Sequence, residues 1–196
     1  MPLTTRKPAV PILMTLSILL TLGVTGLLLT SASADSKKRG RDRDDGPYKK
    51  KLSFAVTHDE VETILTTANS TGHQLGDLRV LTATPIYDET GRLIGRLDAE
   101  LTTSTIDFPE AGDEIRMSVL NFVFGENTDH FAGSSDQLIV SGSGFYPSEQ
   151  STIAAGNILV RPVTGGSGRF FGATGSATTE HLADGTWVHT FEIEVF

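Results

Sequence analysis

Hydrophobic and polar residues alternate along most of the chain after residue 51, which is the period-two pattern of strands with one buried face. Clusters of glycine, aspartate and proline interrupt this alternation. The pattern predicts eight strands, at residues 52–58, 78–87, 93–103, 114–124, 137–143, 152–161, 169–180 and 187–195. The short links between them favour antiparallel, meander order. Closing such a sheet removes its edges, so we expect an all-β, closed eight-stranded antiparallel up-and-down barrel whose interior can hold one small ligand.

Residues 59–77 depart from the alternation. Val61, Ile64 and Leu65 lie at helical spacing within this segment. We expect a short helix or an ordered loop here, placed to plug one mouth of the barrel.

The stretch Arg161–Gly175 holds the densest glycine cluster of the chain. It lacks the Lys-Ser or Lys-Thr of a phosphate-binding P-loop, and its glycine spacing differs from the dinucleotide-binding fingerprint. The predicted structure is a tight turn at 165–168 between two strands.

The N-terminal region has the features of a secretory signal peptide. Arg6 and Lys7 precede an apolar run at 12–29, and small residues occupy 31–34. This order predicts residues 1–34 to be a signal peptide cut after Ala34, with a retained membrane anchor as the alternative. In both cases the barrel lies outside the cytoplasm, and the protein is secreted or periplasmic.

Charge is unevenly distributed along the chain. Residues 35–51 carry eight basic and four acidic residues, which is typical of a charged, disordered linker. The segment 52–196 holds six basic and 20 acidic residues, a formal net charge of −14. Such a surface repels phosphate backbones, so nucleic acid is disfavoured as a partner. The chain has no cysteine and therefore neither disulfides nor thiolate metal sites.

His181 and His189 flank a predicted turn, and the loop length decides which way they face. With a two-residue loop at 184–185 they face opposite ways. With a three-residue loop at 183–185, His181 opposes Trp187 and His189 lies on the same face. The longer loop is favoured, because it gathers apolar residues on one face. The residues gathered in this way are Phe171, Ala173, Ala177, Thr179, Trp187, Phe191, Ile193 and Val195. A third metal ligand at sensible spacing is not visible, so no metal site is expected.

Several short motifs in the order in which they occur resemble the allene oxide cyclase barrel and the plant dirigent proteins that share it. The motifs are Gly76-Asp77-Leu78, Gly91 to Arg96, Phe122 to Gly125, Asp136 to Gly142, and Gly165 to Gly175. In addition, Phe54 followed by His58-Asp59 is similar to the dirigent His-Asp pair that ends the first strand. The resemblance covers nearly all of 52–196.

The resemblance implies a calycin-like barrel, a homotrimer, and an apolar cavity that steers a reactive intermediate without a cofactor. Asp59 matches the dirigent acidic residue after the first strand. Thr174 stands where dirigents have an arginine and allene oxide cyclases have a cavity tyrosine, so it is expected to line the cavity. Arg169 replaces an aspartate of some dirigents. The fold therefore carries over better than the chemistry.

The candidate site residues follow from both lines of reasoning. Asp59 and His58 are the catalytic candidates, because a carboxylate at the mouth of an apolar cavity can act as acid, base or charge stabiliser. Asp59 as the cap of a following helix, with Glu62 as its partner, is the competing interpretation. The candidates for ligand binding are Arg161 and Arg169, which suit a carboxylate, together with Thr174, Trp187 and His189.

Three functions are compatible with these expectations. The first is a secreted barrel that binds a small apolar or amphiphilic molecule and steers its cyclisation or isomerisation without a cofactor. The second is a non-catalytic carrier on the same barrel, and the third is a trimeric structural or interaction domain. Contact with a membrane is expected only through an uncleaved N-terminal segment.

Overall fold

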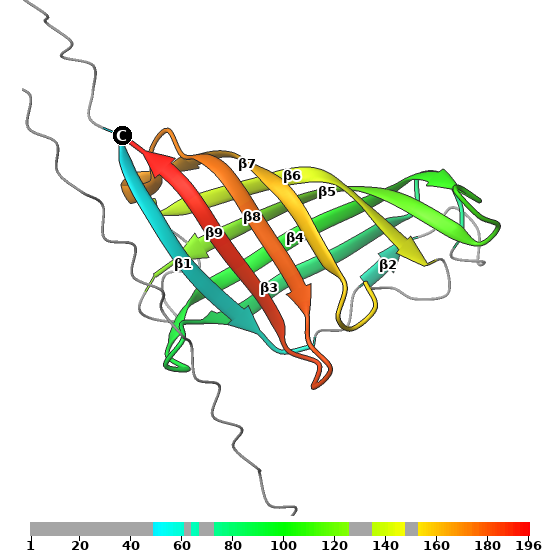
Figure 1. Cartoon of the computed structure of the whole chain (residues 1–196), viewed down its shortest axis with the longest axis horizontal. Helices are drawn as coiled ribbons and strands as arrows, with labels where there is room; N and C mark the ends of the chain where they lie inside the picture. Colours follow the sequence, from blue (N-terminus) through cyan, green and yellow to red (C-terminus); the bar gives the residue numbers. More distant parts are fainter. Residues whose placement is uncertain (1–48, 61–63, 67–72, 126–134, 148–152) are drawn as a thin grey trace, which may run out of the picture. The chain divides into compact units, whose positions relative to one another are not determined.

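The computed structural model describes residues 49–60, 64–66, 73–125, 135–147 and 153–196. The predicted signal peptide and most of the predicted linker lie outside these residues. The elements are β1 (Lys50–His58), β2 (Ile64–Thr66), β3 (Leu78–Tyr87), β4 (Leu93–Ile106), β5 (Asp113–Phe124), β6 (Gln137–Pro147), β7 (Ile158–Ser167), the 3-10 helix η2 (Gly168–Phe170), β8 (Thr174–His181) and β9 (Trp187–Val195). Figure 1 shows these strands wrapped around one interior.

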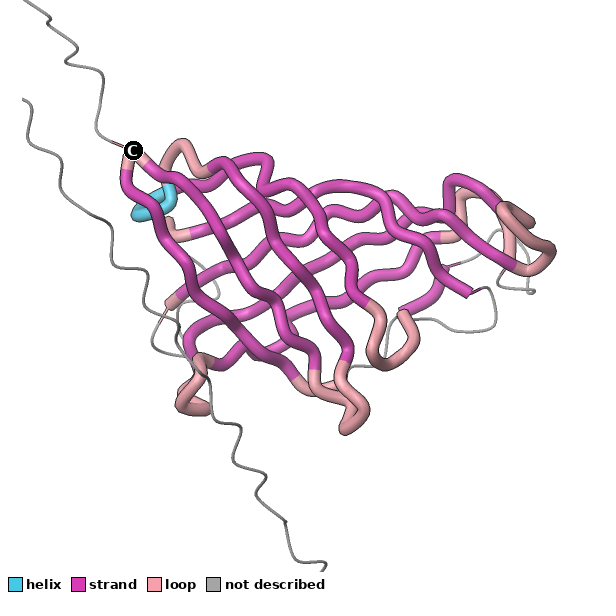
Figure 2. The backbone as a smooth tube through the Cα atoms, viewed as in Figure 1, coloured by secondary structure: helices cyan, strands magenta, loops and turns pink. Residues whose placement is uncertain are grey.

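The strands form one antiparallel sheet that closes on itself. Sheet order is β1-β9-β8-β7-β6-β5-β4-β3-β2, and β1 also pairs with β3 through Thr57 and Tyr87. The barrel therefore consists of the eight strands β1 and β3 to β9, and β2 is an addition that pairs only with β3. The closed eight-stranded antiparallel barrel expected from the sequence is confirmed (Figure 2).

The helical interpretation of 59–77 is wrong where the structure describes this segment. Ile64–Thr66 is an edge strand whose three residues are all exposed. A short run of two aliphatic residues and a threonine is compatible with both helical and strand periodicity. Here the segment pairs with β3 and is therefore a strand. Among the described residues, no helix is long and apolar enough to cross a membrane.

The glycine-rich stretch is extended for longer than predicted. β7 continues through Pro162 to Ser167, and the chain turns only at η2, where Gly168 has φ +59°. Gly166 lies so close to the turn that a Cβ there would sit 2.5 Å from the carbonyl oxygen of Phe170. The glycine at 166 therefore permits close approach of the chain to itself instead of forming the turn.

The predicted three-residue loop between β8 and β9 is confirmed. His181 pairs with Trp187, and the amide of Leu182 donates to the carbonyl of Thr186 at 2.8 Å. Ala177, Thr179 and His189 share one face, as this register requires, and that face is the inward one. Phe171, which the same argument placed with them, is 67 % exposed, because it follows η2 outside the strand.

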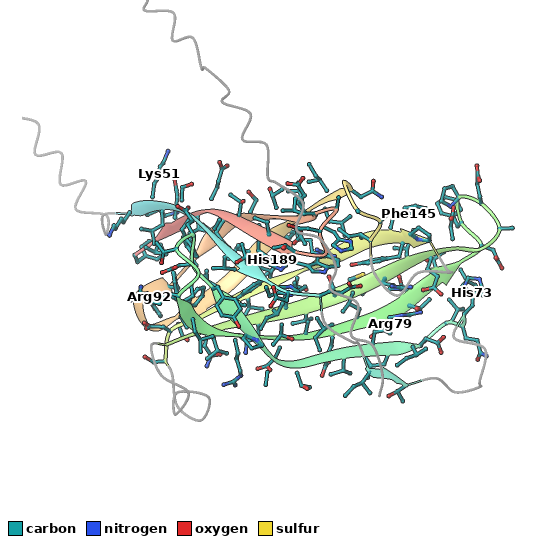
Figure 3. All side chains as sticks on the ribbon, turned by 90° about the horizontal axis from the view of Figure 1, so that it is seen from below. Lys51, His73, Arg79, Arg92, Phe145 and His189 are labelled. Atoms are coloured by element: carbon teal, nitrogen blue, oxygen red, sulfur yellow. The ribbon has the colours of Figure 1, made fainter. Side chains whose placement is uncertain are left out.

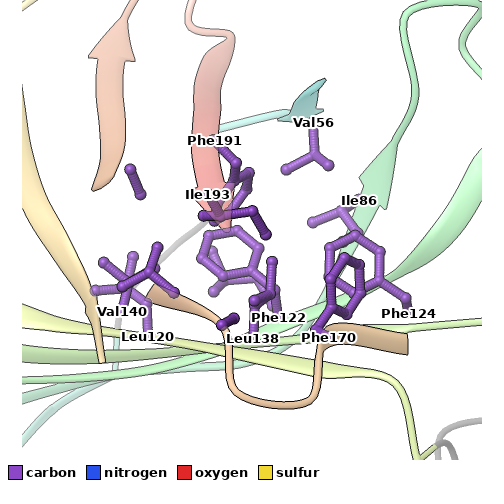
Figure 4. Packing of buried hydrophobic residues seen from close by; sticks show 14 of the residues in the cluster. Val56, Ile86, Leu120, Phe122, Phe124, Leu138, Val140, Phe170, Phe191 and Ile193 are labelled. Atoms are coloured by element: carbon purple, nitrogen blue, oxygen red, sulfur yellow. The ribbon is translucent and has the colours of Figure 1, made fainter. Parts of the chain in front are cut away.

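The inward residues of opposite walls meet in an apolar core. Val56, Phe191 and Ile193 on β1 and β9 approach Leu120, Phe122 and Leu138 on β5 and β6 (Figure 4). Phe122 and Phe191 are fully buried and pack edge to face, with ring centroids 5.0 Å apart. This core fills the middle of the barrel, so the polar features of the interior gather toward the ends.

Candidate functional site

The two ends of the barrel have different chemistry. In Figure 3, Arg92 lies toward one end and His73 toward the other, with His189 between them. The first end, where β1 begins, has an interior lined by phenylalanine. The second end, where β1 finishes, has buried histidine, arginine and glutamate side chains.

The first end opens into a pocket of about 930 Å³, which we call the mouth pocket. Its floor is apolar, and the rings of Phe54 and Phe170 stack there with centroids 5.9 Å apart. A volume of this size is that of a typical small-molecule site. The described residues that line it are Lys50, Leu52, Phe54, Ala55, Asp88, Glu89, Thr90, Arg92, Ile94, Phe124, Gly125, Asp136, Arg169, Phe170, Val195 and Phe196.

Charged residues of both signs surround the mouth pocket. Arg169 pairs with Asp136 at 3.4 Å, and its guanidinium lies 4.8 Å from the centroid of the Phe170 ring. Arg92 pairs with Asp88 at 3.1 Å. Hydrogen bonds from Thr90, and then from Arg92, lower the pKa of Asp88 to about 2. The rim is thus a set of ionised pairs around an apolar floor, which suits an amphiphilic guest.

Toward the second end, four rings form a continuous stack. His181 stacks on Trp187 at 4.4 Å, Trp187 on His58 at 5.9 Å, and His58 on His189 at 5.2 Å between centroids. The four rings come from β8, β9 and β1, which are adjacent in the sheet. The stack depends on the β8–β9 register, because a one-residue slip would turn His189 and Trp187 outward.

Burial keeps the two inner histidines neutral. Desolvation lowers the pKa of His58, although the carbonyl and charge of Asp59 act in the opposite direction. Desolvation also lowers the pKa of His189 well below its usual value, and the charge of Arg161 contributes. His58 donates its Nδ1–H to the carbonyl of Asp59 at 2.7 Å. Its Nε2 is therefore unprotonated in the neutral ring and has the chemistry of a base.

A charged network lies deeper in the second end. Glu114 is fully buried and accepts hydrogen bonds from Arg116 at 2.7 Å and from His73 at 2.8 Å. Arg79 lies 3.5 Å from the same carboxylate. Burial alone would raise the pKa of Glu114, but the bonds from His73 and Arg116 outweigh it and the pKa is lowered. The pKa of His73 is raised, chiefly by Glu114.

Arg161 continues this network across the next strands. Its Nη2 donates to the hydroxyl of Tyr146 at 2.6 Å. The guanidinium of Arg116 lies over the ring of the same tyrosine, 4.4 Å from the centroid. Polar side chains therefore line the second end from β3 to β9.

The structure brings together four of the seven candidates. His58, His189, Trp187 and Arg161 all belong to the interior of the second end. Arg169 lies at the mouth pocket instead.

Two candidates lie elsewhere. Thr174 is exposed, so it does not line the interior: Ala177 and Thr179 show that the opposite face of β8 is the inward one. Asp59 is exposed just beyond the end of β1. Its expected capping partner Glu62 lies outside the described residues.

Sequence reasoning missed Glu114, Arg116 and Tyr146. A signal was present for the first two, because both occupy the same alternating face of β5 as Leu120 and Phe122. Charged residues at core positions of a strand indicate a buried network. Among the described residues, no group of three or more histidine, aspartate or glutamate side chains is placed to hold a metal ion.

Comparison with known proteins supplies structural likeness only. No family model and no curated protein matches the sequence. A solved pyocyanin demethylase is 11 % identical over 72 % of this chain and 99 % of its own, with a TM-score of 0.53. A pterocarpan synthase dirigent protein is 15 % identical over 83 % and 96 %, with a TM-score of 0.50. The Diels-Alderase AbmU from Streptomyces koyangensis is 14 % identical over 78 % and 72 %, with a TM-score of 0.52. The chain therefore shares the fold of barrels that include a dirigent protein and a cyclising enzyme.

Proposed function

We propose that this barrel binds a small apolar or amphiphilic molecule in the mouth pocket and steers its cyclisation or isomerisation without a cofactor. The observation that carries the proposal is the pocket itself, about 930 Å³ with a phenylalanine floor and a charged rim. The shared fold adds support, because two solved barrels of this fold are called a dirigent protein and a Diels-Alderase. The narrower likeness to allene oxide cyclase, secretion and a trimeric state belong to the proposal as well.

Steering is a physical consequence of confinement. A flexible guest held folded against Phe54, Phe124 and Phe170 reacts with itself as in an intramolecular reaction. Well-oriented cases of this kind lower the barrier by about 7–11 kcal/mol. The ion pairs of Arg169 and Arg92 at the rim can orient a polar head while the floor holds the apolar part.

The mouth pocket also supports a second candidate, a non-catalytic carrier. Its titratable lining residues are at the rim, and its described floor is apolar. His58, which has the best-placed free basic nitrogen, belongs to the opposite end of the interior. A guest confined to the mouth pocket would therefore be bound without meeting that base.

One pair of variants tests binding and separates the two candidates. Ile94→Trp fills the mouth pocket, and Ile64→Trp adds the same ring at a strand position that is 59 % exposed. We expect native mass spectrometry to find guests from an amphiphile mixture on the wild type and on Ile64→Trp but not on Ile94→Trp. Guests that bind equally to Ile94→Trp would contradict the pocket.

Product analysis of the bound guests then decides between steering and carriage. Recovery of a cyclised or isomerised guest supports steering, and recovery of the unchanged guest supports carriage. If steering requires the dirigent-like pair, Asp59→Asn removes turnover while sparing binding; unchanged turnover would exclude Asp59.

A further inference from the structure

We propose that the second end of the barrel binds a carboxylate between Arg161 of β7 and His189 of β9. This site is separate from the mouth pocket, and it does not depend on the function proposed above. The two side chains come from strands on either side of β8 and both face the interior. Each has a buried polar nitrogen that lacks a hydrogen-bond partner.

The interior is shaped to admit the Arg161 side chain. It passes over Gly142 and Gly144 of β6, two inward positions that have no side chain. A Cβ at Gly144 would lie 2.9 Å from Leu159 and 3.2 Å from Nη2 of Arg161. A Cβ at Gly142 would lie 3.5 Å from Cγ of Arg161. The glycine at 144 therefore leaves room for the crowded side chains of Leu159, Tyr146 and Arg161, and Arg161 remains 3 % exposed.

The charge of Arg161 is not neutralised by the residues that the structure describes. Its hydrogen-bond partner is the neutral hydroxyl of Tyr146 at 2.6 Å. Its Nε has no acceptor, although it is buried. A buried guanidinium without a carboxylate is costly to desolvate, so such a group is expected to find an anion.

The two buried carboxylates that the structure describes form no ion pair with Arg161, although Oδ1 of Asp77 is itself buried without a partner. Of the charged residues that the structure describes as buried, three are arginines and two are acids: Asp77, Arg79, Glu114, Arg116 and Arg161. Glu114 contacts Arg79, Arg116 and His73. Asp77 accepts from the backbone amide of Gln74 at the start of β3. One positive charge is left over, and Arg161 is the arginine for which the described ion pairs give no acid.

His189 supplies the second donor. Its Nδ1 lies 3.0 Å from the hydroxyl of Thr179, and its Nε2 is buried without a partner. When Thr179 donates to Nδ1, the neutral ring has its proton on Nε2. The strand register places Arg161 opposite Ala177 and His189 opposite Thr179, two residues apart on the inward face of β8. The charge of Arg161 also helps to lower the pKa of His189.

One negative charge with two acceptor oxygens matches this pair of donors. A carboxylate can accept from Nε of Arg161 through one oxygen and from Nε2 of His189 through the other, as charge-assisted bonds. A dianion such as phosphate would leave an excess negative charge in a low-dielectric interior. The site therefore fits a monoanionic acid, either a free small acid or the acid head of a longer molecule.

The test titrates the full chain with sodium acetate, sodium octanoate and 1-octanol, with sodium chloride added to match ionic strength. We expect at least one of the two acids to raise the melting temperature beyond chloride and to shift the Nε2 resonance of His189. The response scored is the shift of the His189 resonance, because an amphiphilic acid can also stabilise the protein through the mouth pocket. Arg161→Met should weaken this response about tenfold or more, since it removes a hydrogen bond to a charged group. Arg169→Met, at the mouth pocket, should leave the His189 response unchanged.

Each outcome decides the proposal. A response to acetate identifies a free small acid, a response to octanoate alone identifies an acid head, and both support the site. An equal response to octanol or chloride, no response, or a response that survives Arg161→Met overturns it. If Arg161→Met does not fold, the wild-type resonance of His189 alone decides. Ile94→Trp should retain the response, so failure here is distinguishable from failure at the mouth pocket.

Discussion

The imidazoles of His58 and His189 stack inside the barrel, with centroids 5.2 Å apart and planes inclined by 21°. They belong to β1 and β9, whose register pairs Val56 with His189. Both side chains are at most 3 % exposed, and both rings have a lowered pKa because burial disfavours the charged form. Protonating either ring would place a charge in the stack and repel the other ring if it were charged too.

This relationship predicts an acid-sensitive fold. A histidine whose folded pKa lies below its unfolded value of about 6.5 stabilises the folded state fully above pH 6.5, and this stability is lost as the pH falls further. We expect the contribution of these two histidines to the melting temperature to be constant from pH 8 to 7. Below pH 6.5 this contribution should decrease. His189→Phe keeps a ring and cannot titrate, so its melting temperature should fall less steeply. An equal slope in the variant would contradict the assignment.

His73 should behave in the opposite way. Its pKa is raised by Glu114, so it contributes stability below pH 6.5 that disappears as the pH rises through its folded pKa. His73→Gln should therefore destabilise the protein more at pH 5.5 than at pH 8. Urea unfolding of the variant and the wild type at both pH values measures this difference, and a larger effect at pH 8 would reverse the predicted sign.

Substitution of Glu114 should reduce the stability of the fold more than substitution of most other residues. Glu114→Gln leaves the buried Arg79 and Arg116 without the carboxylate that they contact. Breaking a buried pair in this way costs about 3–5 kcal/mol. Glu100→Gln on the exposed face of β4 is the matched control and should change stability by less than about 0.5 kcal/mol. Equal small effects in chemical denaturation would mean that the network is not an energetic unit.

Phe191 should stabilise the folded protein mainly through the packing of its ring. It is fully buried, and its ring centroid lies 5.0 Å from the ring centroids of both Phe54 and Phe122. Phe191→Ala should cost about 3–5 kcal/mol, because large-to-small changes in a core lose contacts and leave a cavity. Phe171→Ala, at a site that is 67 % exposed, should cost less than about 0.5 kcal/mol. Denaturant midpoints of the two variants compare these costs directly.

The homotrimer remains a proposal, and the outer face of β5 and β7 is where we would test it. Met117, Val119 and Val160 are 50 %, 48 % and 64 % exposed on this face. Exposed apolar residues gathered on one face are typical of interaction sites. We expect light scattering to give about three times the monomer mass for the wild type and the monomer mass for Val160→Asp. A monomeric wild type would remove the trimer from the account.

The barrel could be predicted from the sequence because the period-two alternation of its strands is strong. The predicted bounds of β3 and β9 match the structure, and the β8–β9 register followed from the requirement that apolar residues share a face. The same requirement predicts that His181, Trp187 and His189 share one face, and these residues stack in the structure. It does not say which face is the interior. The family resemblance implies that Thr174 lines the cavity, whereas the structure has Thr174 exposed.

The remaining differences have physical causes that alternation does not encode. β7 begins six residues later than predicted and continues through Pro162 to Ser167, where Gly166 serves close packing and not the turn. The network of Glu114 and Arg116 is not predicted from the sequence, because charged residues were assumed to lie on the surface. Partners from β3 and from before β3 neutralise Glu114, and such long-range contacts are not visible in a local pattern.

The most direct test of the central claim is a titration of the purified chain with the apolar fluorescent probe Nile red. The account predicts saturable binding of one probe per chain in the wild type and in Ile64→Trp, and loss of binding in Ile94→Trp. No saturable binding in the wild type, or equal binding in Ile94→Trp, would contradict a guest in the mouth pocket.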